Sequence, residues 1–504
     1  MTSAVGLVGG LGVVSSWWPG VAVALPLVGV VAVSVGRLSE RWRVVALVAP
    51  AVAALAVALA IVGDVVAGRL PELFVLHMTP TLWMVLRVDA PGALYGATVA
   101  ALGLLALVFS FGYVHRGPRW SRYFAFLMAS LSCTLGVAYA GNLLTFLIFY
   151  EAFSVLTYAL VVHEQTPEAI RAGAKYIAYI LVGGSLVLAG ILLTYFLAGD
   201  LTFVAGGFLA ADVSRGQLLA AFWCFVAGFG VKAALVPLHG WVPDAHPAAP
   251  APFSAVLSGV MVAAGAFGIM RVALDVFGAD LVRALGVASW LTAIAAVTVL
   301  AGALLAIGQD DLKRRLAYST ISQMGHLTLA VSLLGSGVMA GALVHLVHHA
   351  FLKGTLFFCA GLWIHAGGGR RVGELRGIGA RMPLTAAAFT LAVLGMIGVP
   401  PLSGFVSKWW LGVGMLEVDA GIGLAVLLAG ALLAAAYLLP VVYVVYFAPA
   451  GPTAGRSGRE APATMLAPTL VAAALTIVFG LGSHYGGFPL DLAQLAVAAW
   501  FGGG

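Results

Sequence analysis

The chain has 504 residues, of which 62% are hydrophobic and only 9% are charged, and its mean hydropathy is +1.07. Soluble domains carry about 25% charged residues, so this composition excludes a protein that stays monomeric in water. The formal net charge of +6 does not indicate a nucleic-acid partner, because the basic residues lie in short loops between apolar runs, as in a protein embedded in a lipid bilayer.

Apolar runs of about 20 residues recur along the chain, and a run of this length can cross the hydrocarbon core as a helix. They predict an all-α polytopic membrane protein with about fourteen transmembrane helices. A single transmembrane domain, residues 1–504, is expected, with no inserted soluble domain. In chain order the predicted spans are 20–36, 44–67, 91–112, 122–140, 142–163, 176–198, 217–238, 253–274, 286–307, 316–334, 341–365, 383–416, 423–447 and 462–482.

The distribution of lysine and arginine agrees with alternating spans. One set of loops carries 17 of these residues and the other carries 5, with 3 lysines left inside spans. The rich side is expected to be cytoplasmic, which places the N-terminus outside the inner (cytoplasmic) membrane of the cell. The rich set is Arg37, Arg41, Arg43, Arg116, Arg119, Arg122, Arg171, Lys175, Lys313, Arg314, Arg315, Arg370, Arg371, Arg376, Arg381, Arg456 and Arg459. The poor set is Arg69, Arg87, Arg215, Arg271 and Arg283.

Four charged residues fall inside predicted spans, namely Glu151, Lys232, Lys353 and Lys408. A charge at this depth costs several kcal/mol, so each is a candidate for function. A buried glutamate and lysine on neighbouring helices can pair, and a proton that arrives or leaves then affects both groups. The alternative is that these residues form structural salt bridges or snorkel to the interface, which four charges in one chain make less favourable.

Histidines accompany one of these lysines. His345, His348, His349 and Lys353 share a predicted helix, and spacings of three and four residues place most of them along one stripe. His326 lies in the preceding predicted helix. Histidine titrates near neutral pH and can relay protons. A metal site is the weaker alternative, because no carboxylate or cysteine completes a ligand set. The cysteines are interpreted as small core residues: Cys133, Cys224 and Cys359.

Proline-rich stretches predict two broken helices. Residues 237–252 follow Lys232 and include Pro237 and Pro243, while Pro400 and Pro401 come shortly before Lys408. A helix can break within the membrane only where protein or water satisfies its backbone. Paired breaks next to ionisable groups are typical of ion-transport folds.

Several stretches resemble the antiporter-like subunits of respiratory complex I, of Mrp-type cation/proton antiporters (the D-type component above all) and of energy-converting hydrogenase membrane arms. The longest is GFGVKAALVPLHGWVPDAHPAAPAPFSAVLSG, and four others agree in order: FYEAFSVLTYALVV, QDDLKRRLAYSTISQMGHL, HHAFLKGTLFFCAGLWIH and GVPPLSGFVSKWWL. Together they cover about residues 142 to 410.

The resemblance implies two inverted five-helix repeats, each with one broken helix and one proton half-channel. They would span 122–274 and 286–416, followed by C-terminal helices in 417–504. It also implies roles for single residues. Glu151 would modulate Lys232, the proton-holding centre of the first half-channel. His345, His349 and Lys353 would belong to a connecting hydrophilic axis, supported by His326 and His348. Lys408 would end the second half-channel, and Asp244 and His246 would shape proton uptake.

One position departs from the family's pattern. Many members carry a lysine or histidine in the eighth helix, and here Ala263 stands at that position. Either water, held by residues such as Ser254 and Ser258, bridges the gap or the proton path is interrupted.

The leading hypothesis is a proton-translocating membrane subunit of a multisubunit redox-driven complex. The sequence holds no iron–sulfur, nucleotide or haem motif, so no cofactor is expected in this chain. Redox subunits carrying iron–sulfur or other centres, together with homologous and small membrane subunits, are the expected partners. The chain is then a translocase subunit without a redox site of its own. The alternatives are a sodium/proton antiporter subunit, a membrane subunit that energises a soluble enzyme, and a scaffold that does not pump.

Overall fold

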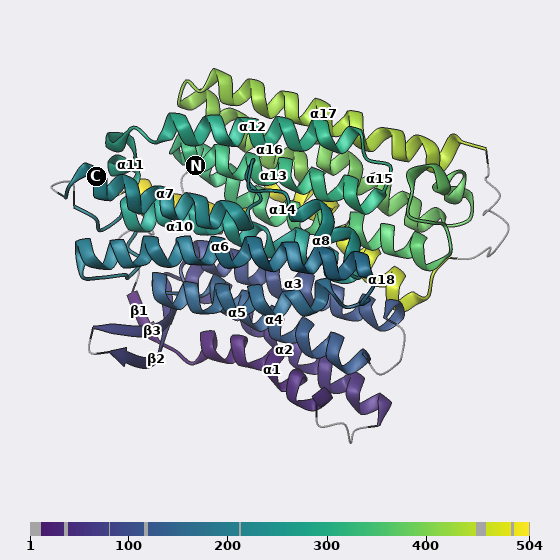
Figure 1. Cartoon of the computed structure of the whole chain (residues 1–504), viewed down its shortest axis with the longest axis horizontal. Coiled ribbons are helices and arrows are strands. Elements are labelled where there is room, and N and C mark those ends of the chain that lie inside the picture. The colour runs from purple at the N-terminus through teal and green to yellow at the C-terminus, as the bar shows by residue number, and fades with distance from the viewer. Residues whose placement is uncertain are drawn as a thin grey trace.

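The computed structural model describes residues 12–34, 39–79, 81–114, 119–210, 213–449, 460–484 and 488–502. The helices lie side by side in an elongated bundle, from α1 and α2 at one edge to α17 at the other (Figure 1). Four members of the charge-rich set lie outside the described residues: Arg37, Arg116, Arg456 and Arg459.

The chain is mostly helical. The helices of the first half are α1 (Trp18–Ser34), α2 (Glu40–Val66), α3 (Ala90–Tyr113), α4 (Trp120–Ala138), α5 (Leu143–Val161), α6 (Pro167–Ala198), α7 (Arg215–Lys232), α8 (Val242–Ala248), α9 (Ala251–Val256), the π-helical η1 (Leu257–Met261), α10 (Ala263–Arg271), the π-helical η2 (Val272–Phe277) and α11 (Ala279–Leu285). Those of the second half are α12 (Ala288–Ile307), α13 (Leu312–Leu333), α14 (Ser336–His365), the short η3 (Val372–Leu375) and η4 (Ile378–Ala380), α15 (Pro383–Ile397), α16 (Ser403–Glu417), α17 (Gly421–Phe447), α18 (Ala463–Leu481), η6 (Gly482–His484) and α19 (Leu490–Phe501).

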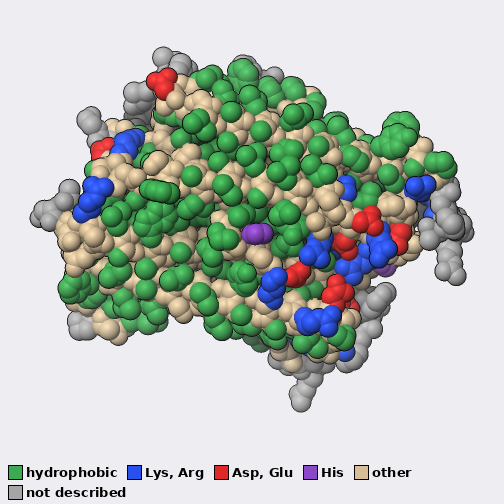
Figure 2. Space-filling model, turned by 45° about the horizontal axis from the view of Figure 1, so that its top comes forward, with side chains coloured by type: hydrophobic (Ala, Val, Ile, Leu, Met, Phe, Trp, Pro, Cys, Tyr) green, Lys and Arg blue, Asp and Glu red, His purple; other side chains and the backbone are tan. Residues whose placement is uncertain are grey.

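The surface has the character of a membrane protein. Among the described residues, 10 helices are long and apolar enough to cross a bilayer. Large apolar side chains point outward along the flanks; Phe196 is 76% exposed and Leu432 is 74% exposed. Figure 2 shows a mainly hydrophobic flank with charged side chains gathered toward the ends of the molecule. This distribution fits burial of the flanks in hydrocarbon and exposure of the ends to water.

Two details of the predicted spans change. The segment 383–416 consists of two helices, α15 and α16, that are separated by a break. Helix α19 was not among the predicted spans, because its 12 residues are too few for the length criterion to detect.

A small sheet corrects the all-α prediction. Strand β1 (Gly12–Ser15) pairs in parallel with β2 (Arg69–Thr79), and β2 pairs antiparallel with β3 (Leu82–Arg87), with Glu72 opposite Arg87. The sheet lies at one end of the bundle (Figure 1). The segment between α2 and α3 therefore satisfies its backbone by strand pairing, a non-local pattern that apolar run length does not reveal.

The most deeply buried helices lie at the centre of the bundle. In both the segment Ala251–Phe277 and α14, the whole most apolar window is buried inside the protein. A helix surrounded by protein can carry polar side chains that would be too costly against lipid. This position explains how α14 accommodates three histidines and a lysine, and how the segment Ala251–Phe277 accommodates two π-helical stretches.

Two helices break where the prolines predict. Helix α7 ends at Lys232, and the chain passes through the cis bond Val236–Pro237 before α8 begins. Helix α15 ends at Ile397, and α16 begins at Ser403 after the cis bond Pro400–Pro401. Each break leaves helix-end carbonyls available for other groups.

The second break depends on a close approach of backbones. A Cβ at Gly404 of α16 would overlap the carbonyl oxygen of Gly395 in α15, whereas a Cβ at Gly412, two turns later, would meet nothing closer than 3.5 Å. We expect Gly404→Ala to lower the free energy of unfolding by about 1–3 kcal/mol, because neither backbone can move without disturbing the break. Gly412→Ala is the matched control. Thermal unfolding of the two purified variants tests this, and equal midpoints would contradict it.

Candidate functional site

The first buried lysine is held by neutral oxygens. Lys232, the last residue of α7, is 0% exposed. Its Nζ donates to the hydroxyls of Ser154 in α5 and Tyr176 in α6, both at 3.2 Å, and lies 4.2 Å from the centre of the Phe153 ring. Three helices therefore converge on one ammonium group.

Glu151 lies close to this group without touching it. It precedes Ser154 by one turn of α5 and packs against Gly184 of α6, where any Cβ would overlap its carboxylate. Within the described chain, the buried Oε1 of Glu151 has no hydrogen-bond partner and forms no ion pair with Lys232. The direct pair considered from the sequence is thus replaced by an arrangement in which Ser154 serves the lysine.

Lys353 has a similar environment in the other half of the chain. It is 0% exposed in α14. Its Nζ donates to the carbonyl oxygen of Leu316 at 2.9 Å and to the hydroxyl of Ser319, both in α13. Lys232 and Lys353 therefore share one property, which is an ammonium group held by uncharged oxygens.

Three histidines continue from Lys353 along the central helices. His349, one turn before Lys353, lies with its ring centre 6.1 Å from that of His345, which lies 6.3 Å from that of His326 in α13. His345 hydrogen-bonds through Nε2 to Gln323 and through Nδ1 to Ser407 of α16, both at 3.0 Å. The rings thus form a row.

The eighth-helix segment meets this row at its first π-helical stretch. The Nε2 atom of His349 lies 3.3 Å from the carbonyl oxygen of Ser258 in η1, and the Ser258 hydroxyl hydrogen-bonds to Thr320 of α13 at 2.7 Å. Ala263 is buried five residues further on. The polar contact of this segment with α13 and α14 is therefore made by Ser258.

Lys408 lies at the second break. It follows Ser407, the partner of His345, and it is half-buried. Its Nζ donates to the carbonyl oxygens of Met396 at 2.7 Å and Ile397 at 2.9 Å, at the end of α15. Lys408 therefore caps the broken helix while its neighbour contacts the histidine row.

Two predicted residues lie elsewhere. His348 stacks on Phe479 of α18, with ring centres 5.9 Å apart. His246 is fully buried against Phe357, and neither of its ring nitrogens has a hydrogen-bond partner among the described residues. Neither histidine shares the row, and His246 does not lie with Asp244.

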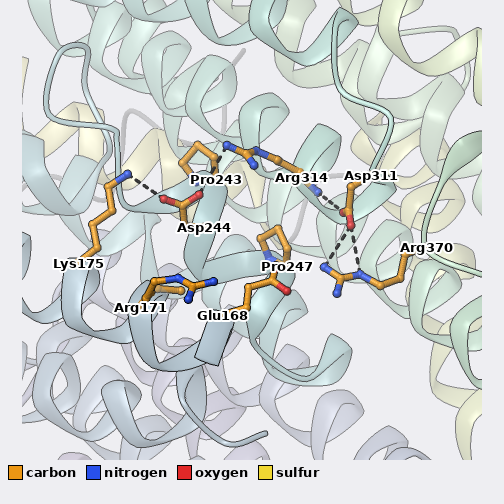
Figure 3. Close-up of a pocket in the computed structure, with 10 residues that line it drawn as sticks. Glu168, Arg171, Lys175, Pro243, Asp244, Pro247, Asp311, Arg314 and Arg370 are labelled. Carbon is orange, nitrogen blue, oxygen red and sulfur yellow. Dashed lines mark hydrogen bonds and ion pairs between the residues drawn. The ribbon is translucent and has the colours of Figure 1, made fainter. Parts of the chain in front are cut away.

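Asp244 lines a charged cleft of about 510 Å3 beneath the first break (Figure 3). Its carboxylate lies 2.7 Å from Lys175 Nζ and 3.6 Å from Arg314 Nη2. Asp311 and Arg370 pair at 3.1 Å on the other side of the cleft. The further lining residues are Glu168, Arg171, Ala172, Pro243 and Pro247.

Sequence reasoning missed other buried charges. Lys313 was assigned to a loop because it precedes two arginines, yet it is 3% exposed and donates to the carbonyl oxygens of Pro247 and Ala249. Arg271 and Asp275 were also missed; they are 3% and 2% exposed and form an ion pair. Glu151 is therefore not the only buried carboxylate, and the four-residue spacing of Arg271 and Asp275 was the available signal.

The described residues contain no group of three or more histidine, cysteine or acidic side chains that could hold a metal ion. The fold and the site together define a class: a polytopic helical membrane protein with lysines and histidines buried between two broken helices.

The family model for the transmembrane part of NADH:quinone oxidoreductase/Mrp antiporter subunits matches residues 140–434, and the chain belongs to this family. It is 37% identical over 400 residues to NADH-quinone oxidoreductase subunit N of Desulforudis audaxviator, covering 76% of this chain and 79% of the relative. It is 30% identical over 429 residues to hydrogenase-4 component B of Escherichia coli, covering 80% of this chain and 63% of the relative. It is thus an antiporter-like membrane subunit.

Solved structures share the fold. A chain of the Mrp complex of a Dietzia species superposes with a TM-score of 0.86 at 23% identity, covering 97% of this chain and 98% of that one. A chain of an archaeal membrane-bound sulfane sulfur reductase gives 0.85 at 26% identity, covering 96% and 98%. A chain of respiratory complex I from Thermus thermophilus gives 0.82 at 23% identity, covering 96% and 99%.

The environment of Lys232 gives a testable prediction for stability. Ser154→Ala removes one of its two hydroxyl partners, so we expect the free energy of unfolding to fall by about 1–3 kcal/mol. Ser185→Ala is the matched control, because the hydroxyl of Ser185 bonds only to the carbonyl of Leu181 in its own helix, at 2.9 Å. Thermal unfolding in nanodiscs compares the two variants. A control that loses as much stability as Ser154→Ala would refute the role given to Ser154.

Proposed function

We propose that this chain conducts protons across the membrane as an antiporter-like subunit of a multisubunit redox-driven complex. The observation that carries the proposal is the environment of Lys232 and Lys353. Both are fully buried, and both bond through Nζ to hydroxyl and carbonyl oxygens. A purely structural charge at this depth is normally neutralised by an opposite charge.

An ammonium group with uncharged partners suits proton transfer. When it releases a proton, it leaves a neutral amine beside neutral oxygens, so no unpaired carboxylate remains in the low-dielectric interior. Glu151 adds a negative charge nearby without a direct bond. A change in its charge would alter how readily Lys232 holds a proton.

The histidine row supplies intermediate groups. His349 follows Lys353 by one helical turn, and His345 connects through Ser407 to the residue beside Lys408. Neutral imidazole accepts a proton on one nitrogen and releases it from the other. Ring centres about 6 Å apart leave room for a bridging water or a small side-chain rotation. Lys353, His349, His345, Ser407 and Lys408 would form the second part of the path.

The partners and the topology also belong to the proposal. The relatives include NADH-quinone oxidoreductase and hydrogenase components, so electron transfer would take place in neighbouring subunits that carry iron–sulfur or other centres. We infer fourteen spans, two inverted repeats and an external N-terminus in the inner membrane. In support, Lys175, Arg314 and Arg370 of the charge-rich set line one cleft, whereas Arg69 and Arg87 lie in the sheet.

A sodium/proton antiporter subunit is the second candidate. The structural similarity to a chain of the Mrp complex is the observation that favours it. Sodium needs several oxygen ligands at short range, and Glu151 offers an unpartnered carboxylate oxygen. Proton flux that depends on sodium would favour this candidate over the redox-driven one.

Replacing Lys232 tests the proposal directly. In the intact complex in sealed vesicles, we expect Lys232→Met to lower the rate of proton translocation at least about tenfold, because no neighbouring group can take the proton. Arg283→Met is the control, since it removes a positive charge from a side chain that is 51% exposed. A pH-sensitive dye measures the flux, and unchanged flux in Lys232→Met would exclude this lysine from the path.

Two histidines on one helix provide a second test. His345 lies in the row, whereas His348 stacks on Phe479 outside it. We therefore expect His345→Gln to reduce proton flux at least about tenfold and His348→Gln to leave it nearly unchanged. The same dye assay applies, with complex assembly checked by native gel. Equal losses in both variants would mean that the row does not carry the proton.

A further inference from the structure

A second cluster of buried charges lies near the end of the bundle that carries the sheet. The Nη1 atom of Arg271 is 2.5 Å from Asp89 Oδ2 and 3.0 Å from Asp275 Oδ2. Trp500 of α19 donates from Nε1 to Asp275 Oδ1 at 2.7 Å. The cluster thus joins the start of α3, the segment Ala251–Phe277 and α19, and the proton path described above does not use it.

The cluster has one more negative charge than positive charge. Asp89 and Asp275 share the single guanidinium of Arg271. The other charged residue at the same cavity is Arg87, which pairs with Glu72 at 2.5 Å and so adds no net charge. Asp275 is 2% exposed, and its Oδ2 makes no hydrogen bond within the described chain. An excess negative charge in such a place is costly unless a proton or cation binds.

Water can reach the cluster. A cavity of about 150 Å3 is lined by Arg87, Asp89, Asp275 and Trp500 together with apolar side chains. This space is large enough for several water molecules, and its polar walls offer them partners. Asp89 remains 30% exposed, so it can exchange protons with that water.

Aromatic rings separate the cluster from Lys232. The ring of Tyr150 lies 6.0 Å from Lys232 Nζ and 5.3 Å from the ring of Phe229. Phe146 contacts Phe229 at 5.4 Å and Phe267 at 6.3 Å, and Phe267 lies 5.8 Å from the guanidinium of Arg271. A layer of this kind excludes water unless its side chains move.

We propose that Asp89 and Asp275 form a carboxylate pair that binds one proton and exchanges it with water on the charge-poor face of the membrane. On uptake, an O–H bond of hydronium breaks and an O–H bond forms on a carboxylate oxygen, and release reverses both changes. The aromatic layer keeps this site apart from Lys232 until it opens. Use of the site in transport rests on the proposed function, whereas protonation of the pair does not.

Infrared difference spectroscopy over a pH titration of the purified chain in lipid tests the protonation. A protonated carboxyl group gives a carbonyl-stretch band that a carboxylate lacks. We expect this band to disappear in Asp275→Asn and also in Asp89→Asn, because either change leaves one carboxylate for one guanidinium. Asp89→Asn keeps an oxygen that can accept from the Gly92 N–H at the start of α3. Asp280→Asn is the control, since Asp280 is fully exposed on the same face.

The outcomes separate the site from the proposed function. Loss of the band in both aspartate variants, with retention in Asp280→Asn and Lys232→Met, supports the proposal. A band that survives in Asp89→Asn overturns the shared excess charge. A band that sodium chloride abolishes and choline chloride does not would make the pair a sodium site and would also overturn it. Unchanged proton flux in Lys232→Met would defeat the proposed function and leave the carboxyl band, and hence the site, unaffected.

Discussion

The cost of holding an ammonium group in the interior of a membrane protein constrains the rest of this structure. Lys232 and Lys353 are fully buried, and each needs oxygen atoms placed within hydrogen-bond distance. Straight helices in lipid have few oxygens to offer, because their carbonyls bond within the helix. The structure supplies them through side-chain hydroxyls on facing helices and, for Lys408, through the open carbonyl end of α15. Packing, helix breaks and the candidate path are therefore parts of one solution.

The same constraint accounts for the distribution of charges across the molecule. At one end, ion pairs between the ends of α6, α8 and α13 surround an open cleft, where water screens them (Figure 3). In the middle, the lysines and histidines contact uncharged oxygens. Toward the other end, Arg271 lies between two carboxylates behind a layer of aromatic rings. Strong ion pairs thus lie nearer the ends of the bundle, and the groups best able to change their charge lie deep inside it.

The sequence predicted the features that depend on local patterns. Run length indicated the helices, prolines indicated the two breaks, and lysine within an apolar run indicated burial. Features that depend on how helices face one another were not predictable. The bond of Lys232 to Ser154 and Tyr176 depends on the rotation of α5, α6 and α7, so pairing with Glu151 was as reasonable from sequence. Lys313 resembles a loop residue because Arg314 and Arg315 follow it, and the sheet depends on pairing between distant segments.

The central claim is that buried lysines change charge during turnover. The chain has only five lysines, so nitrogen-15 labelling of lysine in the intact complex gives a spectrum simple enough to assign with a Lys232→Met variant. Solid-state nuclear magnetic resonance distinguishes an ammonium nitrogen from a neutral amine. The account predicts that the Lys232 signal is divided between the two forms and that their ratio changes when the complex is energised. A Lys232 signal that remains that of an ammonium group under every condition would contradict it.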